Sequence, residues 1–379
     1  MSFDLLRLRR DEFPWAEAGE AIYLNAASTG PLPARSLLAQ REFTEKRAAP
    51  HRLSHEAQFA VVDRARALAT TLIGAEEGSV ALATNTSAGL NLAAWGLPLG
   101  EGDRVVIPDL EFPANVYPWM AASRARRFAL ERVPARDGLI DEDALLLALE
   151  EPGTRVLALS WVGFATGAAA DLDRLGRACR DRGVWLVVDA IQGIGPLVLD
   201  VARTPVDLLA CGGQKWLLSP WGTGFTYVRP SLLEHLTPQP VSWMGVRGSD
   251  DFSTLLDYDL TWRDDARRFE QVTLPYQDFA GMAASLELLT ELGARAIADH
   301  VRARVEELVT GAARAGVPVV TPVTRAGIVT LKPRDVQATS ARLDAHRVIH
   351  SVREGTIRLA PYCYSTPEEI TLALEALVQ

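Results

Sequence analysis

Six short apolar runs between residues 80 and 228 set the expected architecture. They are rich in Val and Leu, and their apolar residues follow one another instead of alternating with polar ones. Strands that are buried on both faces of a mostly parallel sheet have this pattern. Between two of them, residues 171–183 have helical spacing and end on a glycine suited to a helix C-cap. We therefore predict an α/β fold with a doubly wound, mostly parallel sheet. The runs are VALAT (80–84), RVVIP (104–108), RVLALS (155–160), VWLVVD (184–189), DLLAC (207–211) and GFTYV (224–228).

The pattern changes after about residue 286. A long charged amphipathic stretch, 295–315, is followed by VPVVTP, GIVTL and TIRLA. The end of the chain carries a capping box, with Thr366 as N-cap, Pro367 at the first helical position and Glu369 three residues after the cap. We predict a large α/β domain at 15–285 and a smaller α+β domain at 286–379, with residues 1–14 packing on the smaller one.

Composition excludes several classes of function. The 379 residues are 48% apolar and 23% charged, which is ordinary for a globular protein with a real core. A formal charge of −9 argues against a nucleic-acid partner. No apolar run approaches membrane-spanning length, and the first residues lack the apolar core of a signal peptide. Three scattered cysteines argue against a disulfide framework, so we expect a reducing, cytoplasmic compartment.

An acid and an amine stand at the ends of two of the apolar runs. Asp189 ends the run 184–189, and Lys215 follows the run 207–211 after Gly212 and Gly213. A pyridoxal phosphate (PLP) enzyme needs this pair: a carboxylate for the pyridine nitrogen and a lysine for the aldehyde. Each residue also has a simpler interpretation, because Asp189 could cap the next helix and Lys215 could lie exposed on a turn.

Three further segments could complete a cofactor site. Thr86 and Ser87 stand at a predicted helix start, where hydroxyls and backbone N–H groups bind anions, although any Ser/Thr N-cap looks the same. Phe112 could stack on a flat ring or be a core aromatic. Arg358 could grip a carboxylate, while Arg353 nearby could be a surface charge. The dinucleotide and P-loop glycine motifs are absent, and two histidine pairs, 51/55 and 346/350, lack the carboxylates of a metal site.

Taken together, these segments resemble the class V aminotransferase family of fold-type I PLP enzymes. The resemblance runs from YLNAASTGPLP (23–33) to YSTPEEI (364–370). It implies PLP as the cofactor, Lys215 as the residue of the internal aldimine and Asp189 at the pyridine nitrogen. It also implies a homodimer with active sites at the interface, in which RRFEQVTLP (267–275) reaches the neighbouring subunit's phosphate. The remaining implied contacts are Gln192 at the ring hydroxyl, Thr86, Ser87 and Gln214 at the phosphate, Phe112 on the ring, Arg358, Asn25 and Ala27 at the substrate, and Thr273 at the partner's phosphate.

Departures from the family pattern narrow the expected reaction. Cysteine desulfurases carry a catalytic cysteine shortly before the C-terminal arginine, whereas HRVIHSVREGTIR (346–358) has none and Cys363 follows Arg358. Gln214 replaces a usual histidine, and Gly212 replaces a usual serine. We therefore expect the chain to lie nearer the isopenicillin N epimerase-like and kynureninase-like members, with desulfurase activity disfavoured.

The expected function is a PLP-dependent reaction on an amino acid, through an external aldimine and a Cα carbanion. An aminotransferase or an epimerase is the first hypothesis, and a β-lyase of kynureninase or C–S lyase type is the second. A non-catalytic PLP-fold binding module stays open as an alternative, and a nucleotide-dependent oxidoreductase is a distant third. The sequence does not fix the substrate.

Overall fold

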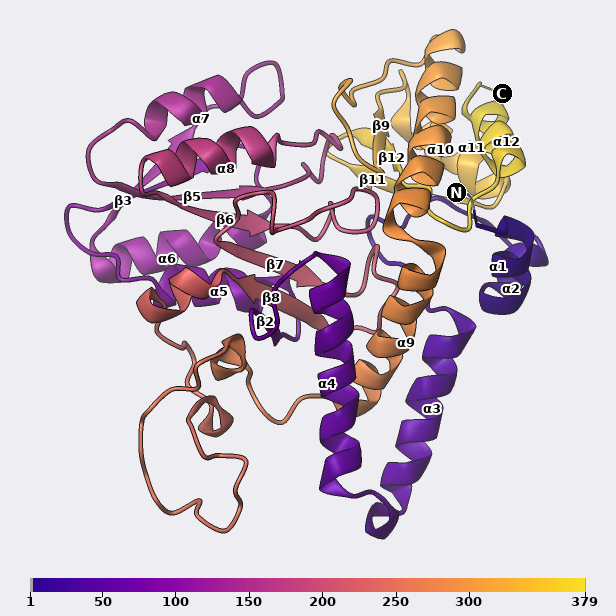
Figure 1. The fold of residues 1–379 in the computed structure, drawn as a ribbon. Coiled ribbons are helices and arrows are strands. Elements are labelled where there is room, and N and C mark those ends of the chain that lie inside the picture. The colour runs from indigo at the N-terminus through magenta and orange to yellow at the C-terminus, as the bar shows by residue number, and fades with distance from the viewer. Residues whose placement is uncertain (1–2, 379) are drawn as a thin grey trace.

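The main sheet is mostly parallel and carries helices on both faces (Figure 1). A computed structural model describes residues 3–378 of the chain. Within them this sheet has seven strands, and all adjacent pairs are parallel except β8 with its two neighbours. The α/β fold expected from the sequence is confirmed. In spatial order the strands are β2 (Val80–Leu82), β8 (Gly224–Val228), β7 (Leu208–Gly212), β6 (Trp185–Asp189), β5 (Thr154–Ser160), β3 (Arg104–Pro108) and β4 (Ala129–Val133).

Alternate residues of the inner strands feed two separate core layers. Val105 and Ile107 of β3 pack in one layer with α5 (Thr86–Gly96) and α6 (Tyr117–Arg126). Val106 packs in the other layer with α7 (Glu142–Ala148) and α8 (Leu172–Asp181). Successive side chains of a strand point to opposite faces, so a strand covered on both faces is apolar throughout. This is why the inner strands read as continuous apolar runs in the sequence.

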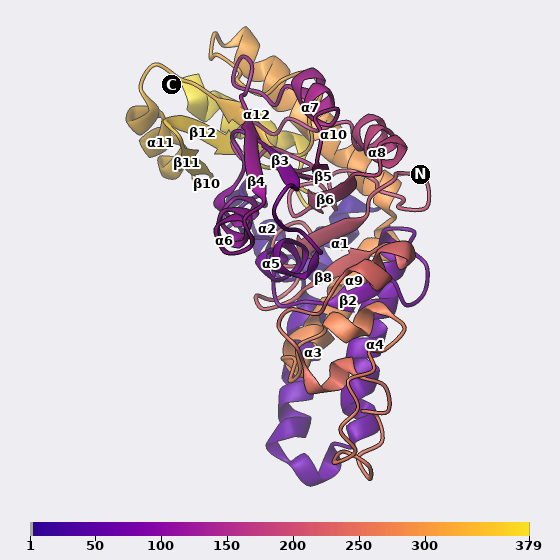
Figure 2. The ribbon, with the colours of Figure 1, turned by 90° about the vertical axis from the view of Figure 1, so that its left-hand side faces the viewer.

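A helical arm extends away from the sheet (Figure 2). It consists of α3 (Ala34–Ala48) and α4 (His55–Leu72), which pack on α9 (Tyr276–Leu292) and are joined at the far end by the short 3-10 turn Pro50–Arg52. After Gly293, whose positive φ of 85° suits a glycine, α10 (Ala294–Arg314) continues the chain. Further short 3-10 turns are Pro113–Asn115, Pro230–His235, Trp243–Gly245 and Ala266–Phe269.

The C-terminal part contains a three-stranded antiparallel sheet in the order β11 (Ser351–Arg353), β12 (Thr356–Leu359) and β9 (Val329–Leu331). It lies with α10, α11 (Val336–Ala345) and α12 (Pro367–Val378), on the right of Figure 1. The start of the chain joins this part. β1 (Ile22–Tyr23) pairs with β10 (Val348–Ile349), and Arg9 of α1 (Leu5–Glu12), the helix before α2 (Pro14–Glu17), donates to the Tyr364 carbonyl at 2.7 Å. The predicted domain boundary at 285/286 falls inside α9, and the division into domains stays an interpretation.

Local signals in the sequence placed some elements and missed others. The predicted capping box of α12 is confirmed, because Thr366 N donates to Glu369 Oε2 at 2.9 Å and Glu369 N donates to Thr366 Oγ1 at 3.1 Å. β4 was not predicted, since it is an edge strand whose charged side chains face solvent. VPVVTP contributes only an isolated bridge, Val319 to Leu331, to the described residues. No helix within residues 3–378 is long and apolar enough to cross a membrane.

Candidate active site

The structure brings Asp189 and Lys215 together at one edge of the sheet. Asp189 is the last residue of β6, and the neighbouring strand β7 ends three residues before Lys215. Burial raises the pKa of Asp189 to about 6, against the opposing effects of a hydrogen bond from Ile191 N to Oδ1 (3.0 Å) and of the Lys215 charge. Burial lowers the pKa of Lys215 to about 8, although Asp189 raises it. Lys215 therefore loses its proton more easily than an ordinary lysine, and it lies beside a buried acid.

Gln192 ties the segment after β6 to the first residues of the site. Its Nε2 donates to the Ala27 carbonyl at 3.0 Å, and its Oε1 accepts from Trp216 Nε1 at 2.8 Å. A primary amide has two N–H donors. The second N–H of Gln192 has no acceptor among the described residues.

The first turn of α5 faces the end of β7. Thr86 Oγ1 accepts from Gly212 N at 2.9 Å, and half-buried Ser87 follows in the same turn. A Cβ atom on Gly212 would lie 2.5 Å from Gln214 Oε1 and 3.1 Å from Thr86 Oγ1, so a larger residue there would displace the end of the Gln214 side chain. The first N–H groups of a helix have no acceptor in the helix itself and attract anions. Thr86, Ser87 and Gln214 thus surround one anion-competent helix start.

Gly30 is a site residue that the sequence reasoning did not single out. Its N donates to the Gln214 carbonyl at 2.8 Å, and a Cβ atom on it would collide with the carbonyl oxygen of Lys215. Two backbone segments far apart in the sequence therefore touch directly beside the lysine. In the sequence, the only indication of this role for Gly30 was a glycine within a segment of small residues.

Phe112 and Phe164 form an aromatic wall beside Lys215. The Phe112 ring is 45% exposed, and its centroid lies 5.8 Å from Lys215 Nζ. The edge-to-face partner is Phe164, with ring centroids 5.3 Å apart. Phe112 is therefore not a core aromatic, and its position suits stacking on a group attached to the lysine.

Arg358 is a buried cation with neutral partners. From β12, its guanidinium donates to Ser351 Oγ (3.2 Å), the Phe164 carbonyl (2.9 Å) and Ser28 Oγ (2.8 Å). Burial, together with the nearby charge of exposed Arg353, lowers its pKa to about 10, and no acid in the described chain offsets these effects. A second unsatisfied group is Asn25 Oδ1, which is buried without a hydrogen-bond partner within residues 3–378.

Glu111 is a second residue that the sequence reasoning missed. Its carboxyl accepts from Ser160 N (2.7 Å), Ser160 Oγ (2.6 Å) and Asn115 Nδ2 (3.0 Å). Burial raises the pKa of Glu111 to about 7, the three hydrogen bonds oppose the shift, and Asp189 adds to it. The only signal in the sequence was its place directly before Phe112.

The comparison with known proteins decides the family. The model of the family described as Aminotransferase class-V matches residues 22–372. The chain belongs to this family. Its relatives include the uncharacterized aminotransferase YcbU of Bacillus subtilis, which is 30% identical over 81% of this chain and 80% of the relative. A probable cysteine desulfurase of Methanothermobacter thermautotrophicus is 30% identical over 94% of each chain. The solved structure of a C-DES mutant with glycine covalently linked to the PLP cofactor superposes with a TM-score of 0.89, at 23% identity, over 98% of this chain and 99% of that one.

Desulfurase activity was wrongly disfavoured for this member of the class V aminotransferase family. The relative named probable cysteine desulfurase matches nearly the whole chain, which conflicts with that exclusion. The exclusion rested mainly on the loop 346–358, which has no cysteine, and also on Gln214 in place of a histidine. Such a loop concerns only the group that receives sulfur, whereas the lysine, acid and arginine serve any reaction at Cα. Cys179, Cys211 and Cys363 are free and buried, and burial raises the pKa of all three thiols.

The class V family is PLP-dependent, and the residues present fit this cofactor. Lys215 offers an amine, the free Oδ2 of Asp189 an acceptor, and the start of α5 an anion site. Arg358 remains without an acid partner in the described residues, as a site for a substrate carboxylate requires. The donor set thus matches the ring nitrogen, aldehyde and phosphate of PLP.

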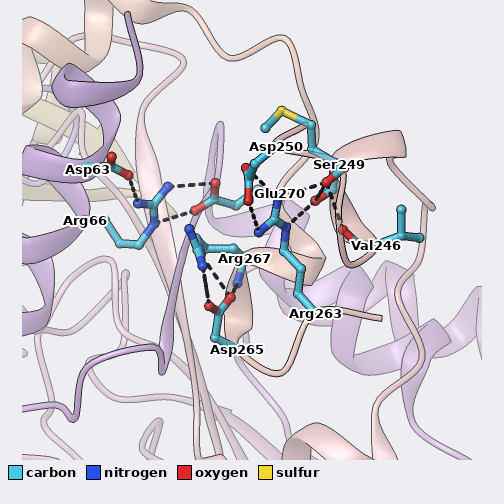
Figure 3. Close-up of polar contacts among 10 residues, drawn as sticks. Asp63, Arg66, Val246, Ser249, Asp250, Arg263, Asp265, Arg267 and Glu270 are labelled. Carbon is cyan, nitrogen blue, oxygen red and sulfur yellow. Dashed lines mark hydrogen bonds and ion pairs between the residues drawn. The ribbon is translucent and has the colours of Figure 1, made fainter. Parts of the chain in front are cut away.

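Thr273 lies on the segment 271–275, which follows Glu270. That segment is anchored by Glu270, which forms a two-pronged ion pair with Arg66 of α4 at 2.8 and 2.9 Å. Thr273 itself is exposed, and its hydroxyl has no hydrogen-bond partner within residues 3–378. Its predicted role at a neighbouring subunit's phosphate therefore stays a prediction. Figure 3 shows the Arg66–Glu270 pair beside two further ion pairs, Arg263–Asp250 and Arg267–Asp265.

Proposed function

We propose that this member of the class V aminotransferase family binds an amino acid beside Lys215 and removes a proton from its Cα, with transamination or epimerisation as the outcome. The observation that carries the proposal is the buried guanidinium of Arg358, which has only neutral partners within residues 3–378. A buried cation without an anion is costly, so a ligand carboxylate would complete it. The planar fork of arginine matches a carboxylate with two parallel hydrogen bonds.

Lys215 is the residue that would bind the cofactor aldehyde and later carry the α-proton. When bound, PLP supplies an electron-withdrawing ring that takes up the electron pair released at Cα. With a pKa of about 8, roughly one Lys215 in ten is neutral at pH 7, against about one in three thousand for an unshifted lysine. Only the neutral amine acts as nucleophile or base. Desolvation of Lys215 therefore supports both of its roles.

The other residues would hold the cofactor and the substrate in register. Asp189 favours a protonated ring nitrogen, since a buried carboxylate stabilises an adjacent cation. Gln192 would donate its free N–H to the ring hydroxyl, and Phe112 would cover the ring. The remaining assignments are Thr86, Ser87 and Gln214 around the phosphate, and Asn25 and Ala27 beside the substrate.

Exchange of the α-proton tests this proposal independently of the final product. The PLP-loaded enzyme is incubated in D₂O with a panel of L- and D-amino acids, with and without a keto acid, and the Cα–H signal is followed by NMR. We expect loss of the signal for at least one amino acid, and no loss with Lys215→Ala. A keto acid product identifies transamination, and the opposite enantiomer identifies epimerisation. Bound PLP with no exchange and no spectral change for any amino acid would refute the proposal and favour a binding module.

The relative named probable cysteine desulfurase supports a second candidate, cleavage of the C–S bond of cysteine. Because the described cysteines are buried, we infer that sulfur would pass to a small thiol in solution. The products then separate two routes. With cysteine, alanine and the persulfide of the added thiol indicate desulfuration, whereas pyruvate, ammonia and sulfide indicate β-elimination. With cystine, β-elimination gives pyruvate, ammonia and cysteine persulfide. Absence of all of these products with cysteine and cystine would exclude this candidate.

We also propose that the active protein is a homodimer in a reducing, cytoplasmic setting. Large apolar side chains stand exposed near the Lys215 loop and on the segment before α9, including Trp221 (74%), Leu256 (81%) and Tyr258 (89%). Exposed apolar patches commonly mark an interface. Light scattering after size exclusion tests the dimer, and a mass of one chain at micromolar concentration would contradict it.

A further inference from the structure

Glu111 lies in the site without a part in the proposed chemistry. Both of its carboxyl oxygens are occupied by three donors from two residues, Ser160 and Asn115. A carboxylate that accepts several hydrogen bonds from fixed groups holds those groups in place, because each bond to a charged acceptor is strong. Glu111 is therefore a mechanical link between the elements that carry its partners.

The contact between Glu111 and Ser160 joins the ends of β3 and β5, and between these two strands the chain reverses its direction along the sheet. From β3 the chain goes outward to β4, and it then returns to β5 on the other side of β3. Loops that leave β3 and β5 consequently diverge, and ligands of α/β sheets bind in the crevice between them. Glu111 lies on the loop after β3. Ser160 ends β5 and stands opposite Asp189 in the register.

The residue after Glu111 is Phe112, whose ring is the aromatic neighbour of the Lys215 amine. Phe112 is 45% exposed and touches another ring only at its edge, at Phe164. The Phe112 backbone carbonyl accepts from Asn115 N at 2.9 Å. The Glu111 carboxyl contacts the side chain of the same asparagine, so both interactions stabilise the turn 111–115. The direction of the Phe112 ring is thus set by the backbone of the turn 111–115 more than by packing.

We propose that Glu111 is a positioning residue whose carboxyl fastens the turn 111–115 to the end of β5, so that the Phe112 ring is preset over the group attached to Lys215. This inference rests on the proposed function. A protonated Glu111 could still donate from Oε2 to Ser160 Oγ, so the link holds in either charge state. Glu111 thus acts on the cofactor through Phe112.

A double-mutant cycle on cofactor affinity tests this coupling. Apoprotein is titrated with PLP, and the Kd is read from tryptophan fluorescence, without any activity assay. We expect Phe112→Ala to weaken binding by about 2- to 13-fold, the range for an aromatic stack. Glu111→Ala is expected to weaken it by about the same factor. The double variant should bind about as weakly as Phe112→Ala alone, because Glu111 has no ring left to position. A double-variant loss equal to the product of the two single losses would overturn the inference.

Glu111→Gln separates positioning from charge. Glutamine keeps an acceptor for Ser160 N and a donor for Ser160 Oγ, and it loses only the contact from Asn115 Nδ2, so we expect a Kd within about threefold of wild type. A loss as large as that of Glu111→Ala would contradict a positioning role. If Glu111→Ala fails the circular-dichroism check of folding, Ser160→Ala removes only the hydroxyl contact, and the same non-additivity with Phe112→Ala is required. Failure of wild-type protein to bind PLP would instead contradict the proposed function.

Discussion

Replacing Arg358 by alanine removes the proposed grip on the substrate carboxylate. A guanidinium has five N–H donors, and three of them are bonded to Ser351, Phe164 and Ser28. Two donors remain, which is the number that a two-pronged carboxylate contact needs. Loss of one partner from a buried charged pair costs about 2–5 kcal/mol. At about 1.4 kcal/mol for each factor of ten, we predict that kcat/KM falls by about 30- to 5,000-fold.

The assay is steady-state kinetics with the best amino acid of the panel, together with the matching amine that lacks the carboxylate. Arg353→Ala is the matched control, because Arg353 is exposed and its side chain bonds only to the Val352 carbonyl among the described residues. We expect that control to stay within about twofold of wild type, as is usual for a surface change. A loss below about threefold for Arg358→Ala would refute the reasoning. So would an equal loss with the amine, since that substrate offers no carboxylate.

Three further predictions follow from the pKa values and the packing. The rate of PLP attachment, followed by stopped-flow absorbance, should reach half its maximum near pH 8 and level off about one pH unit higher, since only neutral Lys215 reacts. Asp189 raises that pKa, so Asp189→Asn should move the midpoint to lower pH. A wild-type midpoint near pH 10.5 would contradict the first point, and an unchanged midpoint in Asp189→Asn the second. Gly30→Ala should raise the PLP Kd by about 5- to 150-fold through overpacking, with Gly100→Ala, which has open space, as the unaffected control. Thr366→Ala should lower the free energy of unfolding in urea by about 1 kcal/mol, and no change would deny the cap a role.

The sequence predicted the inner strands because of how this sheet is covered. Strands with helices on both faces are apolar throughout, so the inner runs at 104–108 and 184–189 stood out. β4 lies at the edge, where Glu131 and Arg132 meet solvent, and its pattern is that of a surface segment. The inner strands and the edge strand differ in their position in the sheet, and the sequence alone does not give that position.

The residues of the candidate site also divide into those that the sequence could predict and those that it could not. Asp189 and Lys215 could be found because Asp189 ends one apolar run and Lys215 lies four residues after the end of another. Glu111 could not, because its partner Ser160 is 49 residues away and only the adjacency of β3 and β5 brings them together. Gly30 depends likewise on a contact with the distant Lys215 backbone. The mistaken exclusion of desulfurase activity came mainly from reading a single loop as decisive.

Covalent trapping of the cofactor tests the central claim most directly. The PLP-loaded protein is reduced with borohydride, digested, and the labelled peptide is identified by mass spectrometry. The account predicts one phosphopyridoxyl label, on Lys215, and its loss in Lys215→Ala. A label on another lysine, or no PLP bound at saturating concentration, would contradict it.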